Sequence, residues 1–217
     1  MKNSYIGQAW LVLSLSLVFG GLLAGVQAAL GPKIEENKRN ETYDQIPDLV
    51  TLRNLETGEV LVRADAGKTV EIVTDDGKVA YKVFSADDKH IGWIIKGAGS
   101  GFAGRIELLI GLTADASRVL GMYVLDQKET PALGDNIKES EFRDRFHDRW
   151  TEAPLEVVRT ITGTAAANDI LAVTGATVSS ESVCKIVNKA VDEFKPWLDA
   201  RTSAHGDPAD QTGPEED

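Results

Sequence analysis

A threonine-rich turn near the C-terminal end of the chain carries the side chains best suited to chemistry. The segment "LAVTGATVSSESVCKIV", residues 171–187, passes from an apolar run through Thr174-Gly175-Ala176-Thr177 into an expected helix. Hydroxyl groups of Thr177, Ser179 and Ser180 lie at the start of that helix, where backbone N–H groups and the helix dipole favour a phosphate. The same residue types also cap helices. Spacing alone therefore favours capping for Thr177.

Two further loops have residues that suit a flat or polar ligand. "KGAGSGFAG", residues 96–104, places glycines around Phe102, and glycine lets a backbone approach a ligand closely. It joins strand to strand with no following helix, so it is not a dinucleotide-binding fingerprint, and a flexible connection also explains it. "DQKETPALGDN", residues 126–136, offers the Glu129 carboxylate and the Thr130 hydroxyl to a polar ring edge. An acidic turn without function explains that loop equally.

The composition excludes several classes of protein. The 217 residues are 42% hydrophobic and 26% charged, which is typical of a globular chain with a core. A formal net charge of -11 argues against nucleic acid as a partner, because phosphates would be repelled. The single cysteine, Cys184, excludes an internal disulfide and a thiolate metal site, and the three histidines are scattered, so no metal is expected. A serine hydrolase is excluded because the G-x-S-x-G motif is absent.

The N-terminal segment predicts a membrane anchor. Residues 9–30, "AWLVLSLSLVFGGLLAGVQAAL", are uncharged, and about 22 residues span roughly 33 Å as a helix. A cleaved signal peptide is the alternative, since Lys2 gives a positive start and Val26-Gln27-Ala28 resembles a cleavage site. The length of the apolar run favours a retained anchor. The few basic residues that flank it lean toward a C-terminus on the inside of the membrane.

Short strands are expected through the middle of the chain. β-Branched and aromatic residues recur in runs that are separated by turn signals such as Asp75-Asp76-Gly77. A helix over 137–150 is indicated by Phe142 and Phe146, and the last helix is expected over about 180–198. The expected strands are residues 59–64, 69–73, 79–84, 91–96, 105–113, 118–125 and 155–160, with a hairpin of central strands formed by 105–113 and 118–125.

These elements predict an α+β fold, in which an antiparallel sheet domain with flanking helices follows one N-terminal transmembrane helix. The last segment is acidic and rich in glycine and proline, so it is expected to be disordered. The expected division is a short flank over 1–8, the anchor over 9–30, a polar stalk compatible with a helix over 31–50, the folded domain over 51–200 and the tail over 201–217.

Three motifs, in order, resemble those of FMN-binding domains. "VTGATVSS" resembles the [ST]-G-A-[ST]-x-[ST]-[SP] flavinylation motif, whose second hydroxyl residue is esterified to the FMN phosphate. "KETPALG" resembles the K-E-T-P-G-L-G loop of that family, and "GSGFAGRIELLIGL" resembles its glycine-rich aromatic loop and central strand. Together with an anchor that runs into "GPKIEENKR", the chain except its acidic tail resembles the G subunits of Rnf electron-transport complexes. Their relatives are the C subunits of the sodium-pumping NADH:quinone reductase.

The resemblance implies a covalent FMN site centred on Thr177. A separate flavin transferase would use FAD and a divalent metal to move FMN onto Thr177 Oγ and release AMP, so no catalytic residue is expected in this chain. Phe102 and the glycine backbone would border the ring system, with Leu133 beneath it. The implied cofactor-binding residues are Thr177, Thr174, Gly175, Ala176, Ser179, Ser180, Glu129, Thr130, Leu133, Gly134, Gly99, Gly101 and Phe102.

Electron transfer is the function that the resemblance implies. The chain would be a single-pass subunit of an inner-membrane complex that moves electrons between reduced ferredoxin and NAD, coupled to Na⁺ or H⁺ transport. Its FMN domain would lie on the extracytoplasmic (periplasmic) side, against the leaning of the basic residues. The first alternative is the FMN-carrying member of the sodium-pumping NADH:quinone reductase or a standalone extracytoplasmic electron carrier. The second is a non-redox anchored binding domain in which Thr177 is only a cap.

Two positions depart from the family pattern. Ala132 stands where the family usually has glycine, which matters if the position requires a positive φ. Leu171 stands where many members carry an aspartate, three residues before the first threonine of the tetrad, and Asp169 lies two residues earlier. If that acid guides the transferase, the efficiency of modification depends on this position.

Overall fold

The computed structural model describes residues 5–53, 60–73, 78–160 and 166–204. The expected strand start at Glu59, the turn at residues 75–77 and the tail from residue 205 lie outside the described residues. The chain divides into two compact units, Met1–Glu41 and Thr42–Asp217.

The first unit is helical wherever it is described. It is part of α1 (Tyr5–Leu49), whose residues 42–49 belong to the second unit. The apolar side chains between Trp10 and Leu30 are exposed, and by length and composition this helix can cross a membrane. The polar residues 31–41 continue the same helix. One long apolar helix near the N-terminus therefore suggests a membrane anchor.

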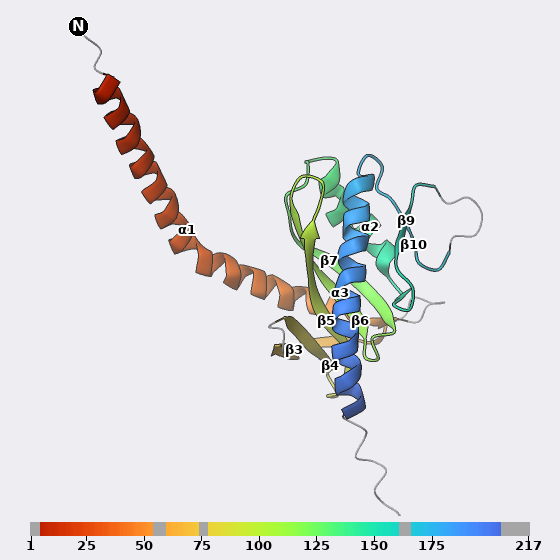
Figure 1. Ribbon diagram of the computed structural model, residues 1–217. Helices are drawn as coiled ribbons and strands as arrows, with labels where there is room; N and C mark the ends of the chain where they lie inside the picture. Colours follow the sequence, from red (N-terminus) through yellow and green to blue (C-terminus); the bar gives the residue numbers. More distant parts are fainter. Residues whose placement is uncertain (1–4, 54–59, 74–77, 161–165, 205–217) are drawn as a thin grey trace, which may run out of the picture. The chain divides into compact units, whose positions relative to one another are not determined.

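A six-stranded antiparallel sheet forms the centre of the second unit, in the order β3-β4-β5-β6-β7-β8 (Figure 1). This confirms the predicted α+β fold and the hairpin of central strands. The strands are β3 (Ala64–Val73), β4 (Val79–Ser85), β5 (His90–Ser100), β6 (Arg105–Thr113), β7 (Arg118–Gln127) and β8 (Arg149–Trp150). Two small sheets accompany it: β1 (Leu52–Arg53) pairs antiparallel with β2 (Val60–Val62), and β9 (Glu156–Val158) pairs parallel with β10 (Asp169–Leu171).

Both faces of the central sheet are buried. In β5, Ile95 packs in the core beneath helix α3 (Thr177–Ala204), whereas Ile94 packs with Ile46 and Leu49 from the end of α1. This is the period-2 alternation of a strand. A Cβ on Gly99 would lie 2.7 Å from Ile186 of α3, so the glycine lets the helix approach the sheet. The last turns of α1 are thus part of the core of the second unit.

Three expectations about element boundaries were wrong. Residues 137–150 form no single helix but a succession: η1 (Gly134–Lys138), α2 (Ser140–Arg143), η2 (Asp144–Phe146) and then β8. Phe142 and Phe146 pack edge to face at 5.2 Å as the spacing predicts, but Asp148 takes a φ of 58° and the chain turns into the sheet. The glycine-rich loop is shorter than expected because β5 continues to Ser100. The last helix begins at Thr177 rather than at residue 180.

Candidate functional site

The start of α3 is held by Ser180. Its Oγ accepts a hydrogen bond from the backbone N–H of Val173 at 3.0 Å and donates one to the carbonyl of Ala176 at 3.0 Å. Gly175 has a φ of 80°, a conformation that an L side chain adopts at a cost, and it turns the chain from β10 into the helix. Because Ser180 is fully buried, its hydroxyl serves this turn and is not presented at the surface.

Thr177 does not act as a side-chain cap. It is the first residue of α3 rather than the residue before the helix, and no hydrogen bond of its hydroxyl is present within the described part of the chain. The first backbone N–H groups of a helix lack partners inside the helix and carry partial positive charge. A hydroxyl without a partner among the described residues therefore stands, half-buried, beside donors that favour an anion.

Glu129 joins the three loops. Its carboxylate is only 6% exposed, and it accepts one hydrogen bond from Ser179 Oγ at 2.5 Å and another from the backbone N–H of Ala103 at 3.1 Å. Ser179 belongs to the first turn of α3, Ala103 to the β5–β6 turn, and Glu129 to the loop that follows β7. Hydrogen bonds to a charged acceptor are stronger than those between neutral groups. One buried carboxylate thus connects segments far apart in sequence.

Glycines make room for this carboxylate. A Cβ on Gly101 would lie 2.2 Å from Glu129 Oε1, and a Cβ on Gly134 would lie 2.6 Å from Glu129 Oε2 and 2.8 Å from Ser179 Oγ. All three distances are below the closest approach of a Cβ to another atom, so the buried Glu129 or Ser179 side chain would have to shift. Gly101 and Gly134 are accordingly explained by the approach of Glu129 rather than by that of a ligand.

The three loops enclose a cavity of about 290 Å³ beside Thr177. Its rim is apolar and open to solvent, since Phe102 is 69% and Leu133 is 48% exposed. Thr174, Ser180, Glu129, Gly99 and Gly101 are not among the lining residues. The lining residues are Phe102, Thr130, Leu133, Gly134, Gly175, Ala176, Thr177, Val178 and Ser179.

Val178 and Ala103 were missed by the sequence analysis. Val178 follows Thr177 and is half exposed at the cavity, an unusual place for a β-branched apolar side chain at a helix start. That exposure follows from where the helix begins, which the sequence placed too late. The role of Ala103 is carried by its backbone N–H, which leaves no signal in the residue type.

Leu171 lies in β10, opposite Val158 of β9. Its carbonyl accepts a hydrogen bond from Arg145 Nη1 at 2.6 Å, and the same nitrogen donates to the carbonyl of Ala172 at 3.2 Å. Asp169 Oδ2 accepts from the backbone N–H of Ala166 at 2.9 Å and does not line the Thr177 cavity. The carboxylate of Asp169 therefore stabilises the turn that precedes β10.

Ala132 adopts a φ of 59° in the loop that follows β7, so this position does require the left-handed conformation. Such a conformation costs an L residue roughly 1–2 kcal/mol. Glycine avoids this cost, but it loses more backbone entropy on folding, which offsets part of the gain. We expect Ala132→Gly to raise the free energy of unfolding by about 0.5–1 kcal/mol, measured by denaturant unfolding of the full chain. Ala103→Gly, at a position without positive φ, should lower it; equal effects of the two substitutions would contradict this explanation.

Cys184 contributes no redox chemistry of its own to this region. Burial, together with the charge of Glu181, raises the pKa of the Cys184 thiol to about 12. At neutral pH almost none of it is the reactive thiolate.

Comparison with known proteins identifies the family to which the folded unit is similar. Residues 101–192 match the family described as FMN-binding domain. The G subunit of the proton-translocating ferredoxin:NAD(+) oxidoreductase complex of Clostridium ljungdahlii is 34% identical over 138 residues, which cover 64% of this chain and 70% of that protein. The G subunit of the ion-translocating oxidoreductase complex of Shewanella baltica is 29% identical over 208 residues, covering 89% of this chain and 91% of that protein.

Solved structures share the fold. NqrC of Shewanella oneidensis superposes with a TM-score of 0.59 at 16% sequence identity, over 76% of this chain and 99% of that one. The C subunit of the Na(+)-translocating NADH-quinone reductase of Parabacteroides distasonis gives a TM-score of 0.53 at 17% identity, over 75% of this chain and 94% of that one. At these identities the likeness concerns the fold alone.

Proposed function

Because this chain belongs to the family of G subunits of ion-translocating oxidoreductase complexes, we propose that it is a membrane-anchored FMN carrier that relays electrons between the other subunits of such a complex. The observation that carries the proposal is the meeting of three separate loops at one hydroxyl without a described partner, that of Thr177, beside an exposed apolar rim. FMN, when bound, exchanges electrons one or two at a time. This chain supplies its position and surroundings.

The residues present fit FMN. Exposed Phe102, Leu133 and Val178 offer apolar surface that a flat ring system would cover, and Thr130 offers a hydroxyl at its edge. A phosphate on Thr177 would lie at the N-terminus of α3, where free N–H groups and the helix dipole stabilise negative charge. Gly175, with its positive φ, adds no side chain between Thr177 and the exposed Leu133, which a Cβ at this position would approach to 3.2 Å.

Attachment of FMN to Thr177 as a phosphoester is the next part of the proposal. The Thr177 hydroxyl attacks the FMN phosphorus of FAD, the bond between the two phosphates breaks, AMP leaves and the hydroxyl proton is lost. In this proposal a separate flavin transferase performs the step and takes up that proton. In the attached state Thr177 fixes the cofactor against dissociation, and Ser179 and Ser180 keep the helix start in place through their own hydrogen bonds.

Intact mass tests the modification. The full chain expressed with a flavin transferase should gain the mass of one FMN minus one water, and the chain expressed without it should show no gain. Loosely bound flavin would instead be lost on denaturation, and the covalent part of the proposal would then fail while FMN binding stood.

We also place the FMN-bearing unit on the extracytoplasmic side. Protection of that unit from protease added to intact spheroplasts would contradict this placement.

A further inference from the structure

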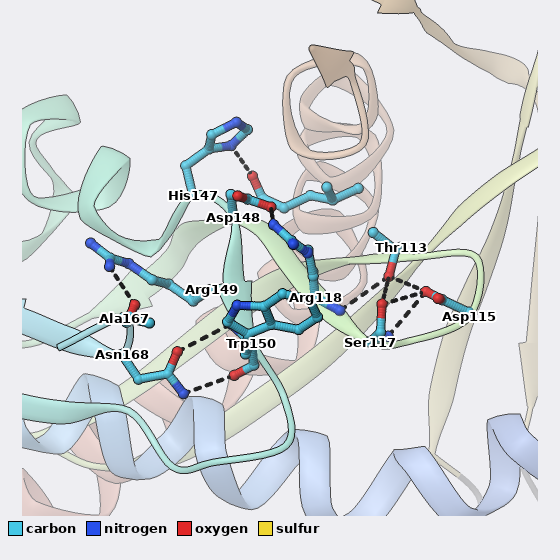
Figure 2. Close-up of polar contacts among 11 residues, drawn as sticks. Thr113, Asp115, Ser117, Arg118, His147, Asp148, Arg149, Trp150, Ala167 and Asn168 are labelled. Carbon is cyan, nitrogen blue, oxygen red and sulfur yellow. Dashed lines mark hydrogen bonds and ion pairs between the residues drawn. The ribbon is translucent and has the colours of Figure 1, made fainter. Parts of the chain in front are cut away.

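Trp150 is an exposed aromatic residue that is held in one orientation (Figure 2). Its side chain is 40% exposed, and the Arg118 guanidinium stacks 3.7 Å from the ring centre while forming an ion pair with Asp148. Asn168 Oδ1 accepts from the backbone N–H of Trp150 at 3.1 Å, and Asn168 Nδ2 donates to the carbonyl of Trp150 at 3.0 Å and to that of Ala153 at 2.6 Å. A large indole is thus fixed at the surface before any partner arrives, which lowers the entropy cost of binding.

A second cavity, of about 490 Å³, opens beside this indole and shares no lining residue with the Thr177 cavity. We call it the Trp150 pocket. Apolar side chains and three carboxylates line it, and no lysine or arginine is among its described lining residues. The lining residues are Trp150, Glu152, Ala153, Pro154, Glu156, Ala166, Ala167, Asn168 and Asp169.

The charged residues that line the Trp150 pocket are all carboxylates. Glu152 and Glu156 are exposed, and neither is ion-paired within the described part of the chain. Three cationic side chains lie near but outside the lining: Arg118 pairs with Asp148, Arg149 Nη1 donates to the carbonyl of Ala167 at 2.6 Å, and Lys195 Nζ donates to Thr151 Oγ1 at 3.2 Å. An apolar floor with accessible carboxylates at its edge is complementary to an apolar side chain flanked by cations.

We propose that the Trp150 pocket docks a basic segment of a neighbouring subunit, with an apolar side chain against Trp150 and a lysine or arginine paired with Glu152 and Glu156. Tryptophan and arginine are the residues most enriched among those that dominate interface energies. The proposal rests on the proposed function, because it requires a complex of several subunits. It gives the chain a docking surface separate from the Thr177 cavity, so that docking leaves the cofactor site uncovered.

Charge reversal tests the docking surface. In cells that express the whole complex, a tagged chain carrying Glu152→Lys and Glu156→Lys should recover the other subunits in a yield lower by about tenfold or more, because like charges then face each other. The matched control, Asp87→Lys with Glu139→Lys, changes the net charge equally at exposed sites outside the pocket and should copurify like the wild type. Covalent flavin should be unchanged in both double variants.

A photocrosslinker placed at Ala153 identifies the occupant. Irradiation of the complex should link Ala153 to a peptide of another subunit that contains lysine or arginine. A linked peptide without a basic residue, a link to lipid alone, or equal copurification of both double variants would overturn the docking proposal and leave the proposed function untouched. If the wild-type chain itself recovers no other subunit, membership of a complex fails, and the docking proposal fails with it.

Discussion

Replacing Thr177 by valine is expected to abolish covalent flavin while the fold persists. Valine keeps the shape of threonine and removes only the hydroxyl, the atom to which we assign the phosphoester. Because that hydroxyl has no hydrogen-bond partner among the described residues, its loss should change the free energy of unfolding by less than about 1 kcal/mol. Flavin fluorescence in a denaturing gel and intact mass measure the first effect, and denaturant unfolding of the unmodified chains measures the second.

Thr177→Ser is the matched control, since it retains a hydroxyl at the same position. It should accept flavin, at a reduced rate because serine is less restricted in χ1 than threonine. Covalent flavin on Thr177→Val would show that another residue is modified. Loss of flavin accompanied by a large loss of stability would instead contradict the assignment, because it would show that the Thr177 hydroxyl serves the fold.

Residue patterns within a few positions of each other predicted several strands of the central sheet. The strands over 79–84, 105–113 and 118–125 followed from β-branched residues and turn signals, and each was observed within a few residues of its expected ends. The prediction of one helix over 137–150 was wrong, because the spacing of Phe142 and Phe146 indicates that the two rings pack together and not that the helix is continuous. Phe142 and Phe146 do meet, but from two short helical segments, α2 and η2, and the chain turns toward β8 at Asp148.

The site was predictable only in part, because its central contact is long-range. The three loops were found from their residue types and their order, and Thr177 from its place in a motif. The hydrogen bond between Ser179 and Glu129 joins residues fifty positions apart, and no periodicity encodes such a pair. The structure accordingly assigns Gly99 to helix packing against Ile186, and Gly101 to the approach of Glu129. The resemblance had implied that both glycines bind the cofactor.

Glu129→Ala is expected to destabilise the unmodified chain and to slow its modification. The substitution leaves the Ser179 hydroxyl and the Ala103 N–H without partners in a buried place, and it opens a void between three loops. Each buried donor without a partner costs about 1–3 kcal/mol, so the free energy of unfolding should fall by about 3 kcal/mol. Glu129→Gln should lose much less, since an amide can still accept from Ala103 and donate to Ser179 Oγ.

A double-mutant cycle with Ser179→Ala separates this role from direct contact with the flavin. If Glu129 acts by holding the loops, the two substitutions should be coupled by about 1–3 kcal/mol in the unfolding of chains that never met the transferase. A residue that serves only the flavin would show no coupling there, because no flavin is present. Reduced modification with an additive cycle would thus contradict the positioning role. Strong coupling would support the positioning role. Gly101 and Gly134 fit that role, because a Cβ at either position would push Glu129 away from Ser179 and Ala103.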